Sequence, residues 1–179
     1  MMINQQVIPA ISNHKKVRQF IDSNLEVGIL MNFQLAQLEQ IVNQLKTANK
    51  KVLIHSELIK GLSSDEYGVI YLIQNLKIDG IISSKPKVIE VCKKRNVYGI
   101  YRFFIKDSIS LEQSIEIAQR LRPDYIEILP GSCYELIESL KNALSCRVWM
   151  GGLINTLEQK LICYNHGADA ITTSNTNLW

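Results

Sequence analysis

The chain has 179 residues, of which 46% are hydrophobic and 21% are charged, and its mean hydropathy is +0.01. This composition predicts a single soluble globular domain over residues 1–179, and it excludes long disordered, collagen-like and coiled-coil chains. The formal charge of +3 is too small to indicate nucleic-acid binding by itself. The longest apolar runs fall far short of the roughly 20 residues that a membrane span needs.

Four cysteines are scattered singly along the chain, at Cys92, Cys133, Cys146 and Cys163. None has a second cysteine or a histidine at metal-ligand spacing, so the sequence predicts neither a metal site nor a cofactor. We expect reduced, mostly buried thiols in a cytoplasmic protein. Residues 1–10 lack a basic segment followed by an apolar one, so no secretory signal is expected.

Short β-branched runs alternate with longer amphipathic segments along the whole chain. Eight strands are predicted, at Val7–Ile11, Val27–Asn32, Lys51–His55, Gly80–Ser83, Val97–Phe104, Tyr125–Leu129, Arg147–Met150 and Ala170–Thr173. Helical periodicity appears between them at Phe33–Asn49, Lys85–Arg95, Ser110–Leu121, Cys133–Ser145 and Thr156–His166. Ser110 and Thr156 are the expected starts of their helices, and Gly167 is the expected stop of the last one.

Apolar strands that alternate with helices predict a parallel sheet covered on both faces. Eight such units favour a closed, compact (β/α)8 barrel of the TIM type, although the usual length of that fold is about 250 residues. Each unit must then be minimal, and residues 174–179 leave room only for a short or incomplete final helix. The alternative is an open, doubly wound sheet that uses five or six of the strands.

In a barrel, the residues at the carboxyl ends of the strands face one mouth, where chemistry is expected. After the seventh and eighth strands stand Gly151-Gly152 and Thr172-Thr173-Ser174-Asn175. Adjacent glycines let a backbone approach an anion closely, and hydroxyl groups add donors, so Gly151, Gly152, Thr173 and Ser174 are candidate phosphate ligands. The alternative is an ordinary tight turn followed by a helix cap.

Arg102 and Glu127 are charged residues inside apolar strands, where an unpaired charge is costly. They are predicted to pair, either as a structural ion pair across the barrel floor or as groups that reach a ligand. His55 closes the third strand and Glu57 follows two residues later. His55 is either a ligand contact or a hydrogen-bonded residue of the rim. Further candidates near the mouth are Ser83, Ser84, Lys85, Asp107, Pro130 and Gly131.

Basic residues form short clusters, mostly on helices or at the amino ends of strands, namely Lys15-Lys16 with Arg18, Lys50-Lys51, Lys85 with Lys87, and Lys93-Lys94-Arg95. Such clusters are usually solvated helix faces. If several of them converged on one rim, they would form a phosphodiester-binding patch. The chain shows no aromatic repeats of the kind that stack single-stranded bases.

Several motifs in this order resemble the glycerol-3-phosphate responsive antiterminator family, the regulators of glycerol uptake operons. They are Ile8-Pro9-Ala10-Ile11, His55-Ser56-Glu57-Leu58-Ile59 with Gly61, Asp65-Glu66-Tyr67-Gly68, Gly80-Ile81-Ile82-Ser83-Ser84, Arg102-Phe103-Phe104 with Asp107, Ile126-Glu127-Ile128-Leu129-Pro130-Gly131, Gly151-Gly152-Leu153-Ile154, and Thr172-Thr173-Ser174-Asn175-Thr176 with Leu178-Trp179. The resemblance runs nearly from end to end.

The resemblance implies a compact barrel that binds glycerol 3-phosphate and, when loaded, acts on the mRNA leader of glycerol-utilisation genes so that transcription reads through a terminator. It implies a sensor rather than an enzyme, with no catalytic residues. Gly151, Gly152, Thr173 and Ser174 would hold the phosphate, and we assign His55, Arg102 and Glu127 to the glycerol end from their strand positions. A homo-oligomer is a further expectation, and no membrane partner is expected.

Two other function classes stay open. An isomerase or lyase acting on a small phosphorylated polyol or sugar would share the phosphate site, but it needs a strand-end base or a Schiff-base lysine. The candidates for that role are Glu127, His55, Lys85 and Lys106. A barrel that only mediates protein contacts would leave the glycines, the hydroxyls and Arg102 without a joint purpose.

Overall fold

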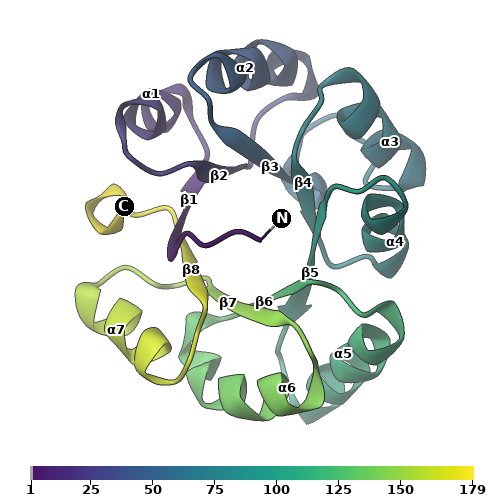
Figure 1. Cartoon of the computed structure of the whole chain (residues 1–179), viewed down its shortest axis with the longest axis vertical. Helices are drawn as coiled ribbons and strands as arrows, with labels where there is room; N and C mark the ends of the chain where they lie inside the picture. The colour runs from purple at the N-terminus through teal and green to yellow at the C-terminus, as the bar shows by residue number, and fades with distance from the viewer. Residues whose placement is uncertain (1) are drawn as a thin grey trace.

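The computed structural model describes residues 2–179 and shows eight parallel strands closed into a barrel (Figure 1). The strands are β1 (Val7–Ile11), β2 (Val27–Leu30), β3 (Lys51–His55), β4 (Gly80–Ser83), β5 (Tyr98–Phe104), β6 (Tyr125–Leu129), β7 (Arg147–Gly151) and β8 (Ala170–Thr173). Each strand pairs with the next one, and β8 pairs with β1. The closed barrel is therefore confirmed and the open sheet is excluded.

Seven helices surround the barrel: α1 (His14–Asp22), α2 (Leu35–Thr47), α3 (Glu66–Asn75), α4 (Pro86–Lys94), α5 (Ser108–Leu121), α6 (Ile137–Ala143) and α7 (Leu157–Asn165). Three 3-10 turns complete the elements, η1 (Ser56–Leu58), η2 (Gly131–Leu136) and η3 (Thr176–Leu178). In Figure 1, the short carboxyl-terminal turn stands between α7 and α1, in the place of an eighth helix. The expected incomplete final helix is confirmed.

Two of the differences between the predicted and the observed helices have a visible structural basis. The helix α5 begins at Ser108 because the Asp107 side chain accepts a hydrogen bond from the Ser110 N–H group, which places Ser110 at the third helical position. The segment predicted as one helix from Cys133 to Ser145 is divided into η2 and α6, and Cys133, within η2, has non-helical backbone angles. Thr156 caps α7 as predicted, and Gly167 follows its end with a φ of +94°.

The barrel interior is filled by side chains that point inward from every strand, among them Ile8, Leu53, Ile100 and Trp149. The amino-terminal segment crosses the centre of the ring in Figure 1 and inserts Ile3 into this interior. The Ile3 N–H group donates to the Tyr125 hydroxyl at 2.7 Å. The amino ends of the strands are thus closed by apolar packing, so the open mouth is at their carboxyl ends.

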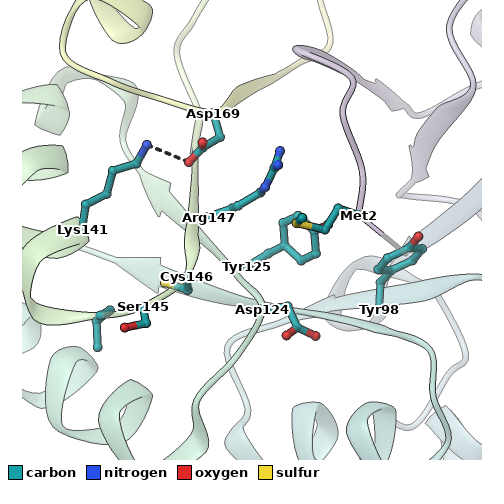
Figure 2. A pocket seen from close by; sticks show the side chains of 10 residues that line it. Met2, Tyr98, Asp124, Tyr125, Lys141, Ser145, Cys146, Arg147 and Asp169 are labelled. Atoms are coloured by element: carbon teal, nitrogen blue, oxygen red, sulfur yellow. Dashed lines mark ion pairs between the residues drawn. The ribbon is translucent and has the colours of Figure 1, made fainter.

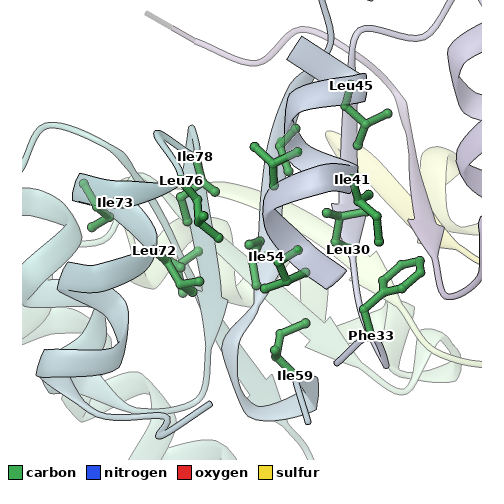
Figure 3. Packing of buried hydrophobic residues seen from close by; sticks show 14 of the residues in the cluster. Leu30, Phe33, Ile41, Leu45, Ile54, Ile59, Leu72, Ile73, Leu76 and Ile78 are labelled. Carbon is green, nitrogen blue, oxygen red and sulfur yellow. The ribbon is translucent and has the colours of Figure 1, made fainter. Parts of the chain in front are cut away.

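A second apolar layer lies between the strands and the helices. Figure 3 shows part of this layer, where Leu30 and Ile54 of the barrel meet Ile41 and Leu45 of α2 and Leu72 of α3. Burial of this kind stabilises by roughly 25 cal/mol per Å² of apolar surface. It fixes the strand ends from which the site is built.

Three features of residues 2–179 bear on the broad class of the protein. No helix there is long and apolar enough to cross a bilayer. No group of three His, Cys, Asp or Glu side chains in that range is arranged to hold a metal ion. All four cysteines are free thiols, of which Cys92 and Cys163 are buried and Cys133 and Cys146 are partly exposed.

Candidate functional site

An ion pair between Arg102 and Glu127 stands at the mouth of the barrel. The two residues are direct partners in the ladder of β5 and β6. The Arg102 Nε and Nη2 atoms lie 2.7 Å and 2.6 Å from the same Glu127 oxygen, Oε2. Glu127 is 1% exposed, so this contact balances a fully desolvated carboxylate. The predicted pairing is confirmed, but it lies at the carboxyl ends of the strands and not on the barrel floor.

The guanidinium of Arg102 also contacts His55, which arrives from β3. The Arg102 Nη1 atom meets the His55 Nε2 atom. Because a guanidinium only donates, Nε2 must accept, and the imidazole proton is assigned to Nδ1. That Nδ1 atom faces the Glu57 Oε2 atom at 3.3 Å. His55 therefore lies between Glu57, which it faces directly, and Arg102, which is paired with Glu127. The His55 side chain is almost completely buried.

Glu57, in the turn after β3, joins the loops that follow β3 and β4. Its Oε1 atom accepts from the Ser83 hydroxyl at 2.9 Å, the Ser84 N–H group at 2.7 Å and the Ser84 hydroxyl at 2.9 Å. Burial by itself raises the pKa of a carboxyl, but the interactions with His55, Ser84 and Ser83 outweigh it and hold the pKa of Glu57 well below its ordinary value. Glu57 therefore accepts these hydrogen bonds as a carboxylate near neutral pH and holds the two loops together.

The other oxygen of Glu127 connects β6 to β8. The Thr172 hydroxyl donates to Glu127 Oε1 at 2.6 Å. Gly151 of β7 lies directly against this bond, and a Cβ atom at Gly151 would fall onto the Thr172 hydroxyl and 2.7 Å from Glu127 Oε1. The residue at 151 must be glycine so that β7 can pass between these two groups. One polar network thus runs from Ser84 to Thr172 across the mouth.

Beside this network lies a cavity of about 160 Å³. It is lined by Ala10, Met31, Arg102, Glu127, Leu129, Gly152, Leu153, Ile154, Asn155, Thr172, Thr173 and Ser174. Three of the four predicted phosphate residues, Gly152, Thr173 and Ser174, are therefore in its wall, together with Arg102 and Glu127. Gly151 and His55 do not line the cavity, but each contacts a wall residue, Gly151 next to Glu127 and His55 next to Arg102. Their assignments as ligand contacts stay predictions.

The loops after β7 and β8 form the outer wall of the cavity. Gly152 has a φ of +74°, and Leu153 beside it has a φ of +61°, a conformation that costs a residue with a side chain roughly 1–2 kcal/mol. The Thr173 hydroxyl is already engaged, since it donates to the Ile154 carbonyl at 2.7 Å and accepts from the Asn175 N–H group at 3.1 Å. The Ser174 hydroxyl is exposed and makes no hydrogen bond within residues 2–179.

The carboxyl-terminal tryptophan holds the β8 loop in place. The Trp179 Nε1 atom donates to the Thr173 carbonyl at 3.0 Å. Its ring packs against apolar side chains on both sides of the gap between α7 and α1. The η3 turn and the Trp179 ring thus cover the barrel between α7 and α1, and they contact the cavity wall from its outer side.

Other candidates from the sequence serve structural roles near the mouth. Lys85 donates to the Ser64 carbonyl at 2.5 Å, and Asp107 caps α5. Gly131 donates its N–H group to the Gly152 carbonyl at 2.9 Å, which ties the β6 loop to the β7 loop. Sequence reasoning missed Ala10, Met31 and Asn155, because nothing in their local patterns marks them as wall residues.

The chemistry available in the cavity follows from its two ionisable wall residues, Arg102 and Glu127. They compensate each other's charge, and each retains hydrogen-bonding capacity toward the cavity, since a carboxylate oxygen offers two lone pairs. Such a pair can accept from and donate to hydroxyl groups. The glycine and serine of the outer wall offer N–H and O–H donors on the opposite side.

Comparisons with known proteins agree with this architecture. A model of the family described as glycerol-3-phosphate responsive antiterminator matches residues 7–179. The crystal structure of a glycerol uptake operon antiterminator regulatory protein from Listeria monocytogenes is similar, with 35% identity, 99% of this chain and 96% of that chain covered, and a TM-score of 0.94. An antiterminator-related protein from Thermotoga maritima has 27% identity, 99% of each chain covered and a TM-score of 0.86.

Two further relatives place the fold more broadly. An uncharacterised Escherichia coli protein, YgcP, is 30% identical over 173 residues, which cover 97% of this chain and 91% of that protein. A deoxyribose phosphate aldolase from Aeropyrum pernix has a TM-score of 0.74 at 13% identity, with 96% of this chain and 86% of that chain covered, and shares the barrel alone. The family match spans nearly the whole chain and agrees with the motifs at the mouth, so this chain belongs to the glycerol-3-phosphate responsive antiterminator family.

Proposed function

We propose that this protein binds glycerol 3-phosphate in the mouth cavity and, when loaded, binds the mRNA leader of glycerol-utilisation genes and allows transcription to read through. The observation that carries the proposal is the cavity itself, which joins an Arg102–Glu127 pair on one side to the Gly152 and Ser174 loops on the other. A volume of about 160 Å³ is well below the roughly 300–1,000 Å³ of sites for drug-sized ligands. It suits a three-carbon ligand.

Electrostatics orient the ligand in this cavity. The phosphate belongs at the Gly152 and Ser174 wall, because that wall offers N–H and O–H donors, whereas the charge of Arg102 at the inner wall is already compensated by Glu127. The hydroxyl groups of the glycerol end then face Glu127 and Arg102, which can accept from and donate to them. Because the cavity would contact both the phosphate and the hydroxyl groups of the ligand, the protein would distinguish glycerol 3-phosphate from glycerol or phosphate alone.

The alternative, an enzyme acting on a small phosphorylated sugar, has weaker support. Aldolase chemistry in such barrels uses a lysine that forms a Schiff base, and proton transfer uses a base with a free oxygen or nitrogen. The described wall residues include no lysine, and Lys85 and Lys106 lie outside the cavity. These positions favour binding over turnover.

Thermal unfolding tests ligand binding directly. Ligand at about 100 times its dissociation constant adds roughly 2.7 kcal/mol to stability, so glycerol 3-phosphate should raise the Tm while glycerol and inorganic phosphate at the same concentration leave it unchanged. The variant Gly152→Val should abolish the response. Its matched control is Gly61→Val, which imposes comparable backbone strain at a φ of +85° away from the cavity and should still respond.

RNA binding needs its own measurement. Leader RNA from a glycerol-utilisation operon of the same genome should bind more tightly when glycerol 3-phosphate is present, and a scrambled transcript of equal length should bind weakly. The affinity should fall steeply with salt, since phosphate contacts release counterions. Equal affinity with and without ligand would contradict gating, and an equal Tm shift with glycerol would contradict the phosphate site.

A further inference from the structure

The end of the barrel opposite to the mouth carries unbalanced positive charge. Lys94 and Arg95 end α4, Arg120 and Arg122 end α5, and Arg147 begins β7. Lys94, Arg95, Arg120 and Arg122 are exposed, and Arg147 is partly exposed. None of the five has a carboxylate within ion-pair distance among residues 2–179. We call these five residues the basic face.

Two neighbouring lysines, Lys93 and Lys141, make contacts that join the elements carrying the basic face. Lys93 reaches from α4 to the end of α5, where its Nζ atom donates to the Leu121 and Arg122 carbonyls at 2.9 Å and 3.0 Å. Lys141 at the end of α6 pairs with Asp169 at 2.9 Å. Adjacent helices pack about 8–10 Å apart, so the arc from α4 to α6 spans roughly 20 Å. This length matches a run of several phosphates.

Helix dipoles account for part of this charge, because cations are favoured at helix carboxyl ends. They do not account for Arg147, which begins a strand, or for two cations at each of the ends of α4 and α5. The carboxylates at this end are Asp79 and Asp169, which are paired with Lys46 and Lys141, and the exposed Asp124. Glu90 and Glu116 lie one helical turn before Lys94 and Arg120. The five cations of the basic face still outnumber these three unpaired carboxylates, although the whole chain carries only +3.

A cavity of about 600 Å³ opens beside the basic face, at the amino ends of β5, β6 and β7. Figure 2 shows Arg147 and Tyr98 bordering this cavity and the Lys141–Asp169 ion pair at its rim. The Tyr98 ring is partly exposed and stands edge-on to Tyr125 at 6.0 Å. An aromatic ring and an arginine that border one cavity are groups on which proteins stack unpaired RNA bases.

A second hollow of about 420 Å³ continues the first one along the arc. It is lined by Gln119, Arg122 and Pro123, and both hollows share the segment Leu144–Cys146. The cations and the two hollows thus form one continuous track over α5, α6 and the start of β7.

We propose that the basic face is the RNA-binding surface, which contacts the phosphate backbone through Lys94, Arg95, Arg120 and Arg122. The cavity at Tyr98 and Arg147 then receives an unstacked base of a loop or single strand. The inference rests on the proposed function, and it places the RNA at the end of the barrel opposite to the ligand cavity. Of the four basic clusters in the sequence, it includes one, through Lys94 and Arg95.

An anionic membrane would also be attracted by this charge, but most of the exposed apolar side chains lie away from the basic face. Stable surface binding needs apolar groups next to the cations. The exposed Phe104, Ile109, Leu153 and Leu157 lie at the mouth end, and Met2 is the large exposed apolar side chain among the lining residues of the basic end. The arrangement favours RNA.

The test uses two triple variants with the same change of charge. The first is Lys94→Gln, Arg95→Gln and Arg120→Gln on the basic face. The control is Lys15→Gln, Lys60→Gln and Lys87→Gln, three exposed lysines outside that face. Binding of the leader transcript is measured across salt concentrations with glycerol 3-phosphate present, and the ligand-induced Tm shift is measured for each protein.

Removal of three backbone contacts should lower the slope of log affinity against log salt by about 2, since each contact on a single strand contributes about 0.7. The basic-face variant should bind RNA at least roughly tenfold more weakly, while the control and the Tm shift keep their wild-type values. The single variant Tyr98→Ala should weaken binding to the leader more than to a fully double-stranded RNA of equal length, because paired bases cannot stack on the ring.

Three results would overturn the inference. If wild-type protein binds RNA and both triple variants bind equally well, the basic face is not the RNA surface, although the proposed function stands. If wild-type protein shows the Tm shift but binds no leader RNA under any condition, the proposed function fails with the inference. If vesicles containing anionic lipid bind wild type in place of RNA, and the basic-face variant loses that binding, the surface is a membrane site.

Discussion

Arg102 and Glu127 face each other across the ladder of β5 and β6, and the Arg102 Nη2 and Glu127 Oε2 atoms lie 2.6 Å apart. The same guanidinium contacts His55, and the same carboxylate accepts from Thr172 at 2.6 Å. Residues of β3, β5, β6 and β8 are therefore joined through one ion pair. Its members cannot be changed singly without leaving a buried polar group unpaired.

Loss of one partner should be far more costly than loss of both. The variant Arg102→Met leaves Glu127 buried without a counter-charge, and it should lower the free energy of unfolding by about 3–5 kcal/mol. The double variant Arg102→Met with Glu127→Gln should recover a large part of that loss. Urea unfolding of the two single variants and the double variant measures the coupling. Additive losses would show that the pair does not act as a unit.

Gly151 should tolerate no side chain while its neighbours remain. The variant Gly151→Ala drives a methyl group between Thr172 and Glu127, and it should cost about 1–3 kcal/mol of stability. In a Thr172→Ala background, the further cost of Gly151→Ala should be smaller, because the nearest atom is gone. Chemical denaturation of the four proteins tests this. An equal cost in both backgrounds would place the strain elsewhere.

The low pKa of Glu57 predicts how stability changes in acid. A carboxyl whose pKa is lower in the folded state than in the unfolded state stabilises the fold above its unfolded value of about 4.3. This stabilisation is lost as the pH falls toward the folded value. Wild-type protein should therefore lose stability below about pH 4.5 more steeply than Glu57→Gln. The free energies of unfolding of both proteins, measured between pH 7 and pH 3, give the comparison, and parallel curves would contradict it.

Trp179 should couple the end of the chain to the ligand site. The variant Trp179→Ala removes both the ring packing and the hydrogen bond to the Thr173 carbonyl, and it should cost about 2–4 kcal/mol and weaken glycerol 3-phosphate binding. Trp179→Phe keeps most of the packing and should cost about 1 kcal/mol. Tm values and ligand titrations separate the two effects. Unchanged ligand affinity in Trp179→Ala would show that the β8 loop needs no such brace.

Fluorescence offers an independent check on this corner of the site. The chain has two tryptophans, and Trp149 is 1% exposed inside the barrel whereas Trp179 adjoins the cavity loop. Glycerol 3-phosphate should therefore change the emission of wild-type protein but not that of Trp179→Phe. A change of equal size in both proteins would locate the effect at Trp149.

Much of the architecture could be predicted from the sequence because it depends on local patterns. The alternation of apolar runs with amphipathic segments located all eight strands, five of them with the observed bounds. Neighbouring strands in an α/β chain usually pair. The sequence alone therefore predicted that Arg102 pairs with Glu127 and that the loops after β7 and β8 lie side by side. The start of α5 was misplaced because Asp107 competes with Ser110 as the cap.

The contacts between residues of non-adjacent strands depend on the closure of the barrel. His55 of β3 meets Arg102 of β5 with a whole strand between them, because inward side chains of alternate strands share a layer in a closed barrel. The close approach that requires glycine at 151, the wall positions of Ala10 and Met31, and the gathering of Lys94, Arg122 and Arg147 on one rim likewise depend on strand register and curvature. Sequence patterns record the neighbours of a residue along its own element, whereas these contacts join residues that only the closed ring brings together.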